Sequence, residues 1–114
     1  MSDAPGLEVT VEERDGTTIV SPQGEIAYAE ATQFRVAVKR VMDQRPRRAV
    51  IDLSKVDYMN TPGVAVMVEA LQAARKGGTR LVLCGVTPKV KAILQIARLT
   101  SVFEITETLG DALA

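Results

Sequence analysis

Short runs of apolar residues predict the strands of a β-sheet. Apolar and polar residues alternate over 7–12, and Arg14-Asp15-Gly16 supplies a turn before 17–22, so the chain is predicted to begin with a hairpin. Residues 49–53 and 80–84 are apolar runs rich in branched side chains, as in strands buried inside a sheet.

Three longer stretches, 29–43, 62–76 and 88–98, space their apolar residues three and four positions apart and are predicted to be amphipathic helices. Gly77-Gly78 is a natural stop for the second. The positions expected to face the core are Ala31, Phe34, Val38, Val41 and Met42 in the first helix, Val64, Met67, Val68, Leu71 and Ala74 in the second, and Val90, Ile93, Leu94 and Ala97 in the third.

The order strand, helix, strand over 49–84 predicts a βαβ unit, which normally makes a parallel strand pair with the helix over one face of the sheet. Residues 101–105 are expected to add a short edge segment and 108–114 a last turn or two of helix. The predicted fold class is therefore α/β, with a mixed sheet of about four to five strands, an N-terminal hairpin and about four helices.

The length of the chain indicates how many domains it forms, and its charge indicates which partners are disfavoured. The 114 residues fit one domain, placed at 7–114 after a loose tail at 1–6. Basic and acidic residues balance at 14 each, so no net field draws the chain to nucleic acid or to an anionic membrane. No apolar run approaches the roughly 20 residues of a membrane span, and 1–6 lacks the features of a signal peptide. We expect a cytoplasmic protein without membrane insertion.

The rarest residue types exclude several kinds of chemistry. Histidine is absent and cysteine occurs once, which excludes a His-based triad or zinc site and an internal disulfide. The single thiol, Cys84, lies in an apolar run and is interpreted as a packing residue. Gly77-Gly78 and Gly85 match no phosphate-binding glycine motif, so a nucleotide-binding or hydrolytic domain has little support. The arginines in 45–48 are interpreted as solvated charges. We expect a protein that is not an enzyme and holds no metal or cofactor.

The junction before the second helix carries the candidate site residue, Thr61. Unpaired N–H groups and the helix dipole favour an anion at a helix start, so phosphate carried by Thr61 would be supported there. Pro62 has no N–H, which leaves Gly63 and Val64 as the expected donors. Thr87-Pro88 precedes the third helix in the same way, and both threonines fit an N-cap followed by proline. The residues alone leave a cap and a regulatory site both open.

A wider pattern surrounds this junction. The run Ile51-Asp52-Leu53-Ser54 is followed by Met59-Asn60-Thr61-Pro62-Gly63, and Gln23-Gly24-Glu25-Ile26 lies upstream. These segments resemble the Asp-Leu-Ser, Met-Asp-Ser-Ser or Met-Asp-Ser-Thr-Gly, and Gly-Glu-Leu-Asp motifs of the STAS domain of anti-sigma factor antagonists. Leu83 to Val90 and Leu99 to Ile105 resemble later parts of that domain, and the resemblance covers about 7–107 in order.

The resemblance implies a non-enzymatic regulatory module switched at Thr61. In the family, the residue after the Met-Asp pair is phosphorylated by a serine/threonine kinase with a histidine-kinase-like fold, which is also the anti-sigma factor. The unmodified antagonist binds this kinase and frees a sigma factor. Phosphorylation ends the binding until a phosphatase, of the PP2C type, removes the phosphate. Thr61 occupies the phosphoacceptor position, with Asn60, Pro62, Gly63 and Val64 around it.

The partner is expected at the end of the sheet that holds Thr61. The loop with Glu25 and Ala27 should lie at that end, and Tyr28 beside it is either an exposed interface anchor or a lid over the first helix. Three residues depart from the family: Asn60 for aspartate, Pro62 for a hydroxyl residue, and Ala27 for an acid. They motivate an alternative, a phosphorylation-independent scaffold in a stressosome-like, chemosensory or lipid-transport complex, in which Thr61 only caps its helix.

Overall fold

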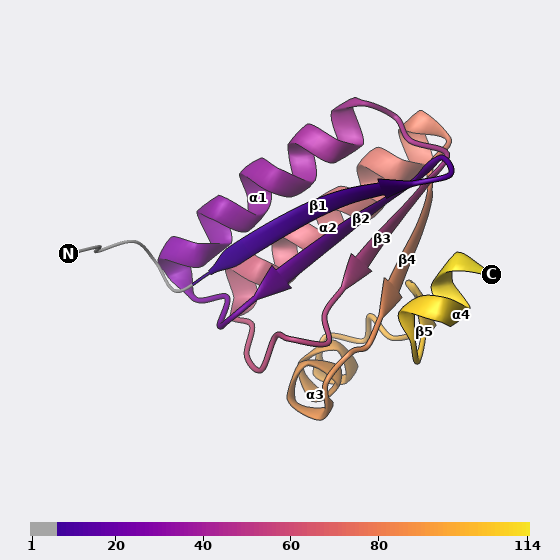
Figure 1. The fold of residues 1–114 in the computed structure, drawn as a ribbon. Helices are drawn as coiled ribbons and strands as arrows, with labels where there is room; N and C mark the ends of the chain where they lie inside the picture. Colours follow the sequence, from indigo (N-terminus) through magenta and orange to yellow (C-terminus); the bar gives the residue numbers. More distant parts are fainter. Residues whose placement is uncertain (1–6) are drawn as a thin grey trace.

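A mixed five-stranded β-sheet forms the centre of the fold in the computed structural model, which describes residues 7–114 (Figure 1). The elements are β1 (Glu8–Arg14), β2 (Thr17–Gln23), α1 (Tyr28–Asp43), β3 (Arg48–Asp52), α2 (Thr61–Gly77), β4 (Arg80–Cys84), α3 (Pro88–Ile96), β5 (Glu104–Thr106) and α4 (Leu109–Leu113). The predicted α/β class, with a mixed sheet, an N-terminal hairpin and four helices, is confirmed. The tail expected at 1–6 lies outside the described residues.

The strands lie side by side in their sequence order, β1-β2-β3-β4-β5. β1 and β2 are antiparallel, and their turn places Asp15 and Gly16 at positive φ, 51° and 83°, which suits a two-residue hairpin. All other neighbours are parallel. Because β2, β3 and β4 point the same way, the loops that lead into α1, α2 and α3 all leave the sheet at one end.

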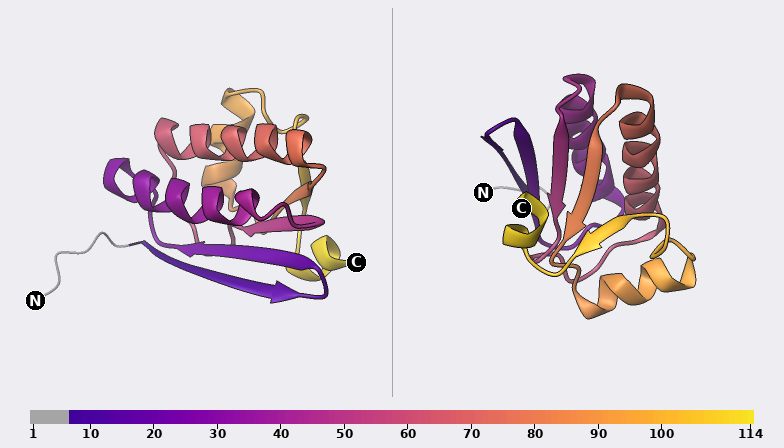
Figure 2. Two further views of the ribbon diagram at one scale, coloured as in Figure 1. Left: turned by 90° about the horizontal axis from the view of Figure 1, so that it is seen from above. Right: turned by 90° about the vertical axis from the view of Figure 1, so that its right-hand side faces the viewer.

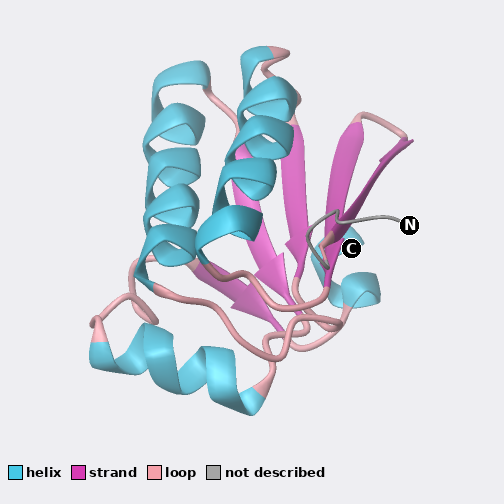
Figure 3. Ribbon diagram, turned by 90° about the vertical axis from the view of Figure 1, so that its left-hand side faces the viewer, coloured by secondary structure: helices cyan, strands magenta, loops and turns pink. Residues whose placement is uncertain are grey.

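The helices cover the two faces of the sheet unequally. α1 and α2 lie side by side over one face and α4 lies against the other (Figure 2), while α3 crosses the end of the molecule where α1 and α2 begin (Figure 3). The main core fills the space under α1 and α2, where Phe34 and Met67 are fully buried. A second, smaller core under α4 contains Ile19, Val50, Val82, Cys84 and Ala112.

The predicted core faces of the helices are confirmed with one exception. All five positions of α1 are buried, and those of α2 are buried or packed against the core. In α3, Val90 and Leu94 are buried and Ile93 is partly buried. Ala97 is exposed, contrary to the prediction, because α3 ends at Ile96 and Arg98 then takes a φ of 59°.

The last strand begins three residues later than predicted, at Glu104 instead of 101. The N–H groups of Val102 and Phe103 both donate to the carbonyl oxygen of Leu99, at 3.0 and 3.3 Å. These bonds keep 99–103 in turns, so extended pairing starts only where Glu104 lies opposite Val82.

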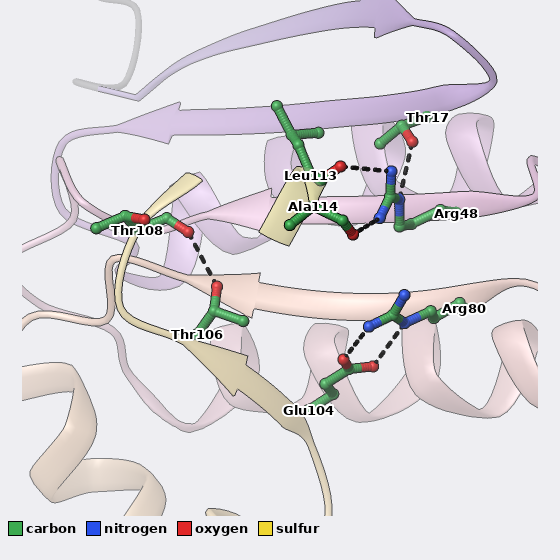
Figure 4. A network of polar contacts seen from close by, with 8 residues as sticks. All are labelled: Thr17, Arg48, Arg80, Glu104, Thr106, Thr108, Leu113 and Ala114. Atoms are coloured by element: carbon green, nitrogen blue, oxygen red, sulfur yellow. Dashed lines mark hydrogen bonds and ion pairs between the residues drawn. The ribbon is translucent and has the colours of Figure 1, made fainter. Parts of the chain in front are cut away.

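The arginines in 45–48 were predicted to be solvated charges. For Arg48, the first residue of β3, this prediction is wrong. Arg48 is half-buried, and its Nε donates to Thr17 Oγ1 at 2.9 Å (Figure 4). Its two terminal nitrogens donate to the backbone oxygens of Leu113 and Ala114, each at 3.1 Å. Backbone oxygens at a helix C-terminus carry partial negative charge, so Arg48 holds α4 on the sheet.

No helix within residues 7–114 combines the length and the apolar character needed to cross a membrane.

Candidate functional site

Two loops are joined at the end of the sheet where α1 and α2 begin. Three backbone hydrogen bonds connect them: Gly24 N–H to Lys55 O at 3.0 Å, Ile26 N–H to Tyr58 O at 2.9 Å, and Asn60 N–H to Ile26 O at 2.9 Å. Ile26 and Met59 form a parallel β-bridge between the loops. The β2–α1 loop and the start of α2 therefore lie together, as the sequence predicted.

Gly63 allows α2 to pack closely on this bridge. Ile26 and Met59 point into the core and are almost fully buried. A Cβ atom at position 63 would lie 2.6 Å from Met59 Cγ and 2.8 Å from Ile26 Cγ2, so no side chain fits without displacing one of them. The first turn of α2 is thereby fixed against both loops.

The helix cap of α2 is Asn60, and the alternative in which Thr61 is the cap is wrong. Asn60 has extended backbone angles, and its Oδ1 accepts from the Gly63 N–H at 3.1 Å. Thr61 is the first helical residue and Pro62 the second. An asparagine amide oxygen caps as well as a hydroxyl does, so the residue before Thr61 takes that role and leaves the threonine side chain exposed.

The same cap changes the expected anion contacts. The N–H of Gly63 is bonded to Asn60 Oδ1, and the N–H of Val64 donates to Asn60 O at 3.1 Å. Both groups are also buried in the first turn. They are not free donors for a phosphate on Thr61, contrary to the prediction, and electrostatic support there comes from the helix dipole.

The two Thr-Pro junctions differ in the structure. Thr87 is at the N-cap position of α3, as predicted, but its hydroxyl donates to Val56 O at 2.8 Å instead of capping the helix. That hydroxyl is half-buried and ties α3 to the β3–α2 loop. The side chain of Thr61 is exposed. Of the two threonines, Thr61 is the more exposed.

The β2–α1 loop, which is predicted to contact a partner, carries exposed residues at the same end of the sheet as Thr61. Ala27 is the N-cap residue of α1, and its N–H donates to Glu30 Oε1 at 3.2 Å. Glu25 is exposed and Tyr28 is 80% exposed. The alternative in which Tyr28 forms a lid over α1 is therefore wrong.

Tyr58 also belongs to this surface and was not predicted from the sequence. Its neighbour Met59 points into the core, and side chains alternate along an extended segment, so Tyr58 points outward and is 43% exposed. The chain has two tyrosines, and both lie at this end. Val56 is buried although it lies two residues before Tyr58, so burial over 56–60 does not alternate as in a regular strand, and the exposure of Tyr58 could not be predicted from the pattern. We call Glu25, Ala27, Tyr28, Tyr58 and Thr61 the Thr61 surface.

Comparison with known proteins accounts for this arrangement. Residues 8–112 match the STAS domain. The chain belongs to the STAS domain family. A Bordetella bronchiseptica protein assigned provisionally as anti-sigma factor antagonist BtrV is 29% identical over 108 residues, 95% of this chain and 93% of that protein.

Two further similarities extend over almost the whole STAS domain. The anti-sigma-F factor antagonist RsfB of Mycobacterium tuberculosis is 27% identical, covering 99% of this chain and 92% of RsfB. The crystal structure of an anti-sigma factor antagonist from Mycobacterium paratuberculosis is 28% identical, with a TM-score of 0.84 and coverage of 96% of this chain and 94% of that one. The family resemblance seen in the sequence is confirmed.

The one thiol of this STAS domain is a core residue, as predicted. Cys84 is fully buried under α4. Burial, with a smaller contribution from the nearby Asp52 carboxylate, raises the pKa of the thiol to about 12. A thiol with so high a pKa carries almost no thiolate near neutral pH and is a poor nucleophile.

Proposed function

We propose that this STAS domain acts as an anti-sigma factor antagonist, in a partner-switching cycle controlled by phosphorylation of Thr61. It binds, through the Thr61 surface, a serine/threonine kinase with a histidine-kinase-like fold that also serves as the anti-sigma factor. The relatives named as anti-sigma factor antagonists and the match across the whole domain support this role. The proposed role is binding, not catalysis.

One observation carries the proposal: at the family's phosphoacceptor position, the start of α2 carries an exposed threonine. The two loops joined at this end of the sheet carry two exposed tyrosines, Tyr28 and Tyr58. Tyrosines are enriched in the centres of protein interfaces because they bury a large apolar area at low entropic cost. Phosphorylation would add about −1.5 to −2 charges in the middle of this surface. Burying that charge against a partner is costly, so the phosphate separates the two proteins without refolding either.

The cycle also requires an enzyme that restores the unmodified threonine. A PP2C-type phosphatase fits this role, because the phosphate on an exposed first-turn residue is open to hydrolysis.

The Asn60 cap is compatible with a phosphate on Thr61. Asn60 keeps the first turn formed through its neutral amide, and it adds no negative charge beside the phosphate.

Phosphate mapping tests the proposal directly. The purified chain is incubated with ATP and each anti-sigma-type serine/threonine kinase encoded in the same genome, whose ATP turnover is checked separately, and phosphate is located by mass spectrometry. We expect modification at Thr61, its loss in Thr61→Ala, and its return in Thr61→Ser. Thr87→Ala is the matched control, since its hydroxyl is engaged with Val56 O, and should leave labelling unchanged. Labelling elsewhere, or none with an active kinase, refutes the switch.

A second function is favoured by the occupied N–H groups of Gly63 and Val64. With Pro62 lacking an N–H, this first turn offers a phosphate few direct hydrogen bonds. The chain would then be a phosphorylation-independent scaffold in a stressosome-like, chemosensory or lipid-transport complex. In that case Thr61→Glu would leave the affinity for the partner unchanged, whereas the switch requires a large loss.

A further inference from the structure

The outer edge of β1 is open along its whole length. Within residues 7–114 no strand pairs with that edge, while all seven residues of β1 pair in continuous register with β2 on the other side. Every second residue of an antiparallel strand directs its N–H and C=O away from the partner strand, so the open edge of β1 carries a row of hydrogen-bonding backbone groups. The opposite edge of the sheet, β5, has only three residues. β1 is therefore the longer edge at which the sheet can be extended.

An apolar flank lies beside this edge. Val11 lies opposite Val20, a core residue under α1, so Val11 points to the α1 face of the sheet, where it is 53% exposed. A hollow of about 420 Å³ lies between β1 and α1, and its lining includes Val9, Val36 and Ala37. Val36 itself is 51% exposed. This flank offers apolar contact to the side chains of an added strand.

β1 lacks the usual protections of an edge strand. It contains no proline or lysine, and its pairing with β2 runs without a bulge. Its charged residues are Glu8, Glu12, Glu13 and Arg14. Such charges disfavour a pairing that places two of the same sign opposite each other, and they favour one that places unlike charges opposite each other. The charge pattern therefore restricts which strand can pair here, and in which register.

A second copy of β1 satisfies this charge pattern in one register. Two-fold pairing of identical edge strands into one continuous sheet is antiparallel and keeps both α1 helices on the same face. A pair centred on Val11 places Glu8 of each copy opposite Arg14 of the other copy, and Val11 opposite Val11. A pair centred on Thr10 or on Glu12 instead places two glutamates opposite each other. The sequence of β1 is thus complementary to itself about Val11.

Both charged groups of the expected contact are available for it. The Nε of Arg14 donates to Glu12 Oε2 at 2.6 Å, while its two terminal nitrogens make no hydrogen bond within residues 7–114. Glu8 is exposed and takes part in none of the ion pairs formed among these residues. Arg14 can therefore keep Glu12 and also bind Glu8 of a second copy.

We infer that β1 is a self-association edge, at which two copies of the chain join their sheets through an antiparallel β1–β1 pair centred on Val11. Backbone groups supply the hydrogen bonds, Val11 and the flank of α1 supply the apolar contact, and two Glu8–Arg14 pairs fix the register. A contact of one strand is small, so the dimer is weak and reversible. Because the two β1 strands run in opposite directions, the two Thr61 surfaces lie at opposite ends of the joined sheet. Dimer formation goes beyond the proposed function and does not depend on it.

Analytical ultracentrifugation of the full chain, at concentrations up to about 1 mM, tests the inference. The wild type should form dimers at the upper concentrations. Val11→Glu places two carboxylates opposite each other at the two-fold axis and should weaken dimerisation about tenfold. Ile96→Glu is the matched control, because it makes the same kind of change at an apolar residue that is 84% exposed and lies outside β1, and it should dimerise like the wild type. A wild type that stays monomeric, or equal dimerisation of all three proteins, overturns the inference.

A charge exchange tests the register. Glu8→Arg alone and Arg14→Glu alone each place like charges opposite each other twice in their own dimers, and each should dimerise about tenfold more weakly than the wild type. When the two variants are mixed, both Glu–Arg pairs are restored, and the mixed dimer should form about as tightly as the wild-type dimer. This recovery also shows that the single variants are folded.

The control for this mixture separates register from net charge. Arg75→Glu, at an exposed position of α2, has the same net charge as Arg14→Glu but leaves β1 unchanged. Fluorescently labelled Glu8→Arg should bind Arg75→Glu about fivefold more weakly than it binds Arg14→Glu. Equal binding to the two, or no association in the mixture of Glu8→Arg with Arg14→Glu, overturns the β1–β1 pairing.

Discussion

Asn60 Oδ1 accepts a hydrogen bond from the Gly63 N–H at 3.1 Å, and this contact separates capping from signalling at the start of α2. The cap is made by the residue before Thr61, so the threonine side chain has no structural task there and is exposed. The stability of the first turn and the proposed phosphorylation therefore depend on different residues, which makes them separable by mutation.

Removing the cap should cost stability, and removing the threonine should not. Asn60→Ala is expected to lower the free energy of unfolding by about 1 kcal/mol, because the Gly63 N–H loses its partner. Thr61→Ala should change it by less than about 0.5 kcal/mol. Urea unfolding followed by circular dichroism measures both. A larger loss for Thr61→Ala than for Asn60→Ala would show that the cap is wrongly assigned.

Gly63→Ala should be the more harmful of two glycine substitutions in α2. The new methyl group would lie 2.6 Å from Met59 Cγ and 2.8 Å from Ile26 Cγ2, both buried, so we expect a loss of about 1–3 kcal/mol. Gly77→Ala is the control, since its methyl group would meet only the flexible Arg45 side chain, at 3.4 Å. Equal stability of the two variants in thermal unfolding would contradict the close packing at Gly63.

Arg48→Met should loosen α4. The substitution removes the hydrogen bonds to Thr17 and to the backbone oxygens of Leu113 and Ala114, while it keeps much of the side-chain volume. Opening of α4 exposes Cys84, so its reaction with a thiol reagent should accelerate about tenfold. The neighbouring Arg47→Met, which removes an exposed charge, should leave the rate unchanged. Equal rates for the two variants would show that Arg48 does not hold the helix.

Cys84 should reduce the stability of the protein at alkaline pH. In the unfolded chain the thiol ionises near its ordinary pKa of 9.0, whereas in the folded chain its pKa is about 12. Above pH 9 the unfolded state therefore loses a proton that the folded state keeps, and stability declines as the pH rises toward 12. The stability advantage of the wild type over Cys84→Ala should shrink between about pH 8 and 10.5 in urea titrations. A constant difference would contradict the raised pKa.

The spacing of apolar residues along the chain predicted most of the helices and strands, because this spacing is regular in the longest elements. The apolar stripe of α1 and the apolar runs of β3 and β4 decide burial by themselves, and their bounds agree with the structure to within one residue. The end of α3 and the start of β5 were misplaced. α3 ends where Arg98 takes a positive φ and the Leu99 N–H returns to Leu94 O, and β5 starts late because the next turns are closed by Leu99 O. Such turn hydrogen bonds leave no mark on the periodicity of apolar residues.

Within the site, the sequence predicted which segments lie close together, but it did not predict the individual hydrogen bonds between them. The topology of parallel strands brings Glu25, Tyr28 and Thr61 to one end, and this was predictable. The cap at Asn60 was missed because asparagine and threonine are both good caps, and the choice depends on backbone angles. Outside the site, the contacts of Arg48 were missed because its partners are backbone oxygens 65 and 66 residues away.

The central claim, that charge at Thr61 controls partner binding, is tested most directly by one affinity comparison. Binding of the anti-sigma-type kinase that phosphorylates the chain is measured for the wild type, Thr61→Glu, and Gln72→Glu, which adds the same charge on an exposed position of α2 about 16 Å along the helix. We predict that Thr61→Glu weakens binding roughly 100-fold and that Gln72→Glu has no effect. Equal affinity of all three proteins would contradict the switch and favour the scaffold.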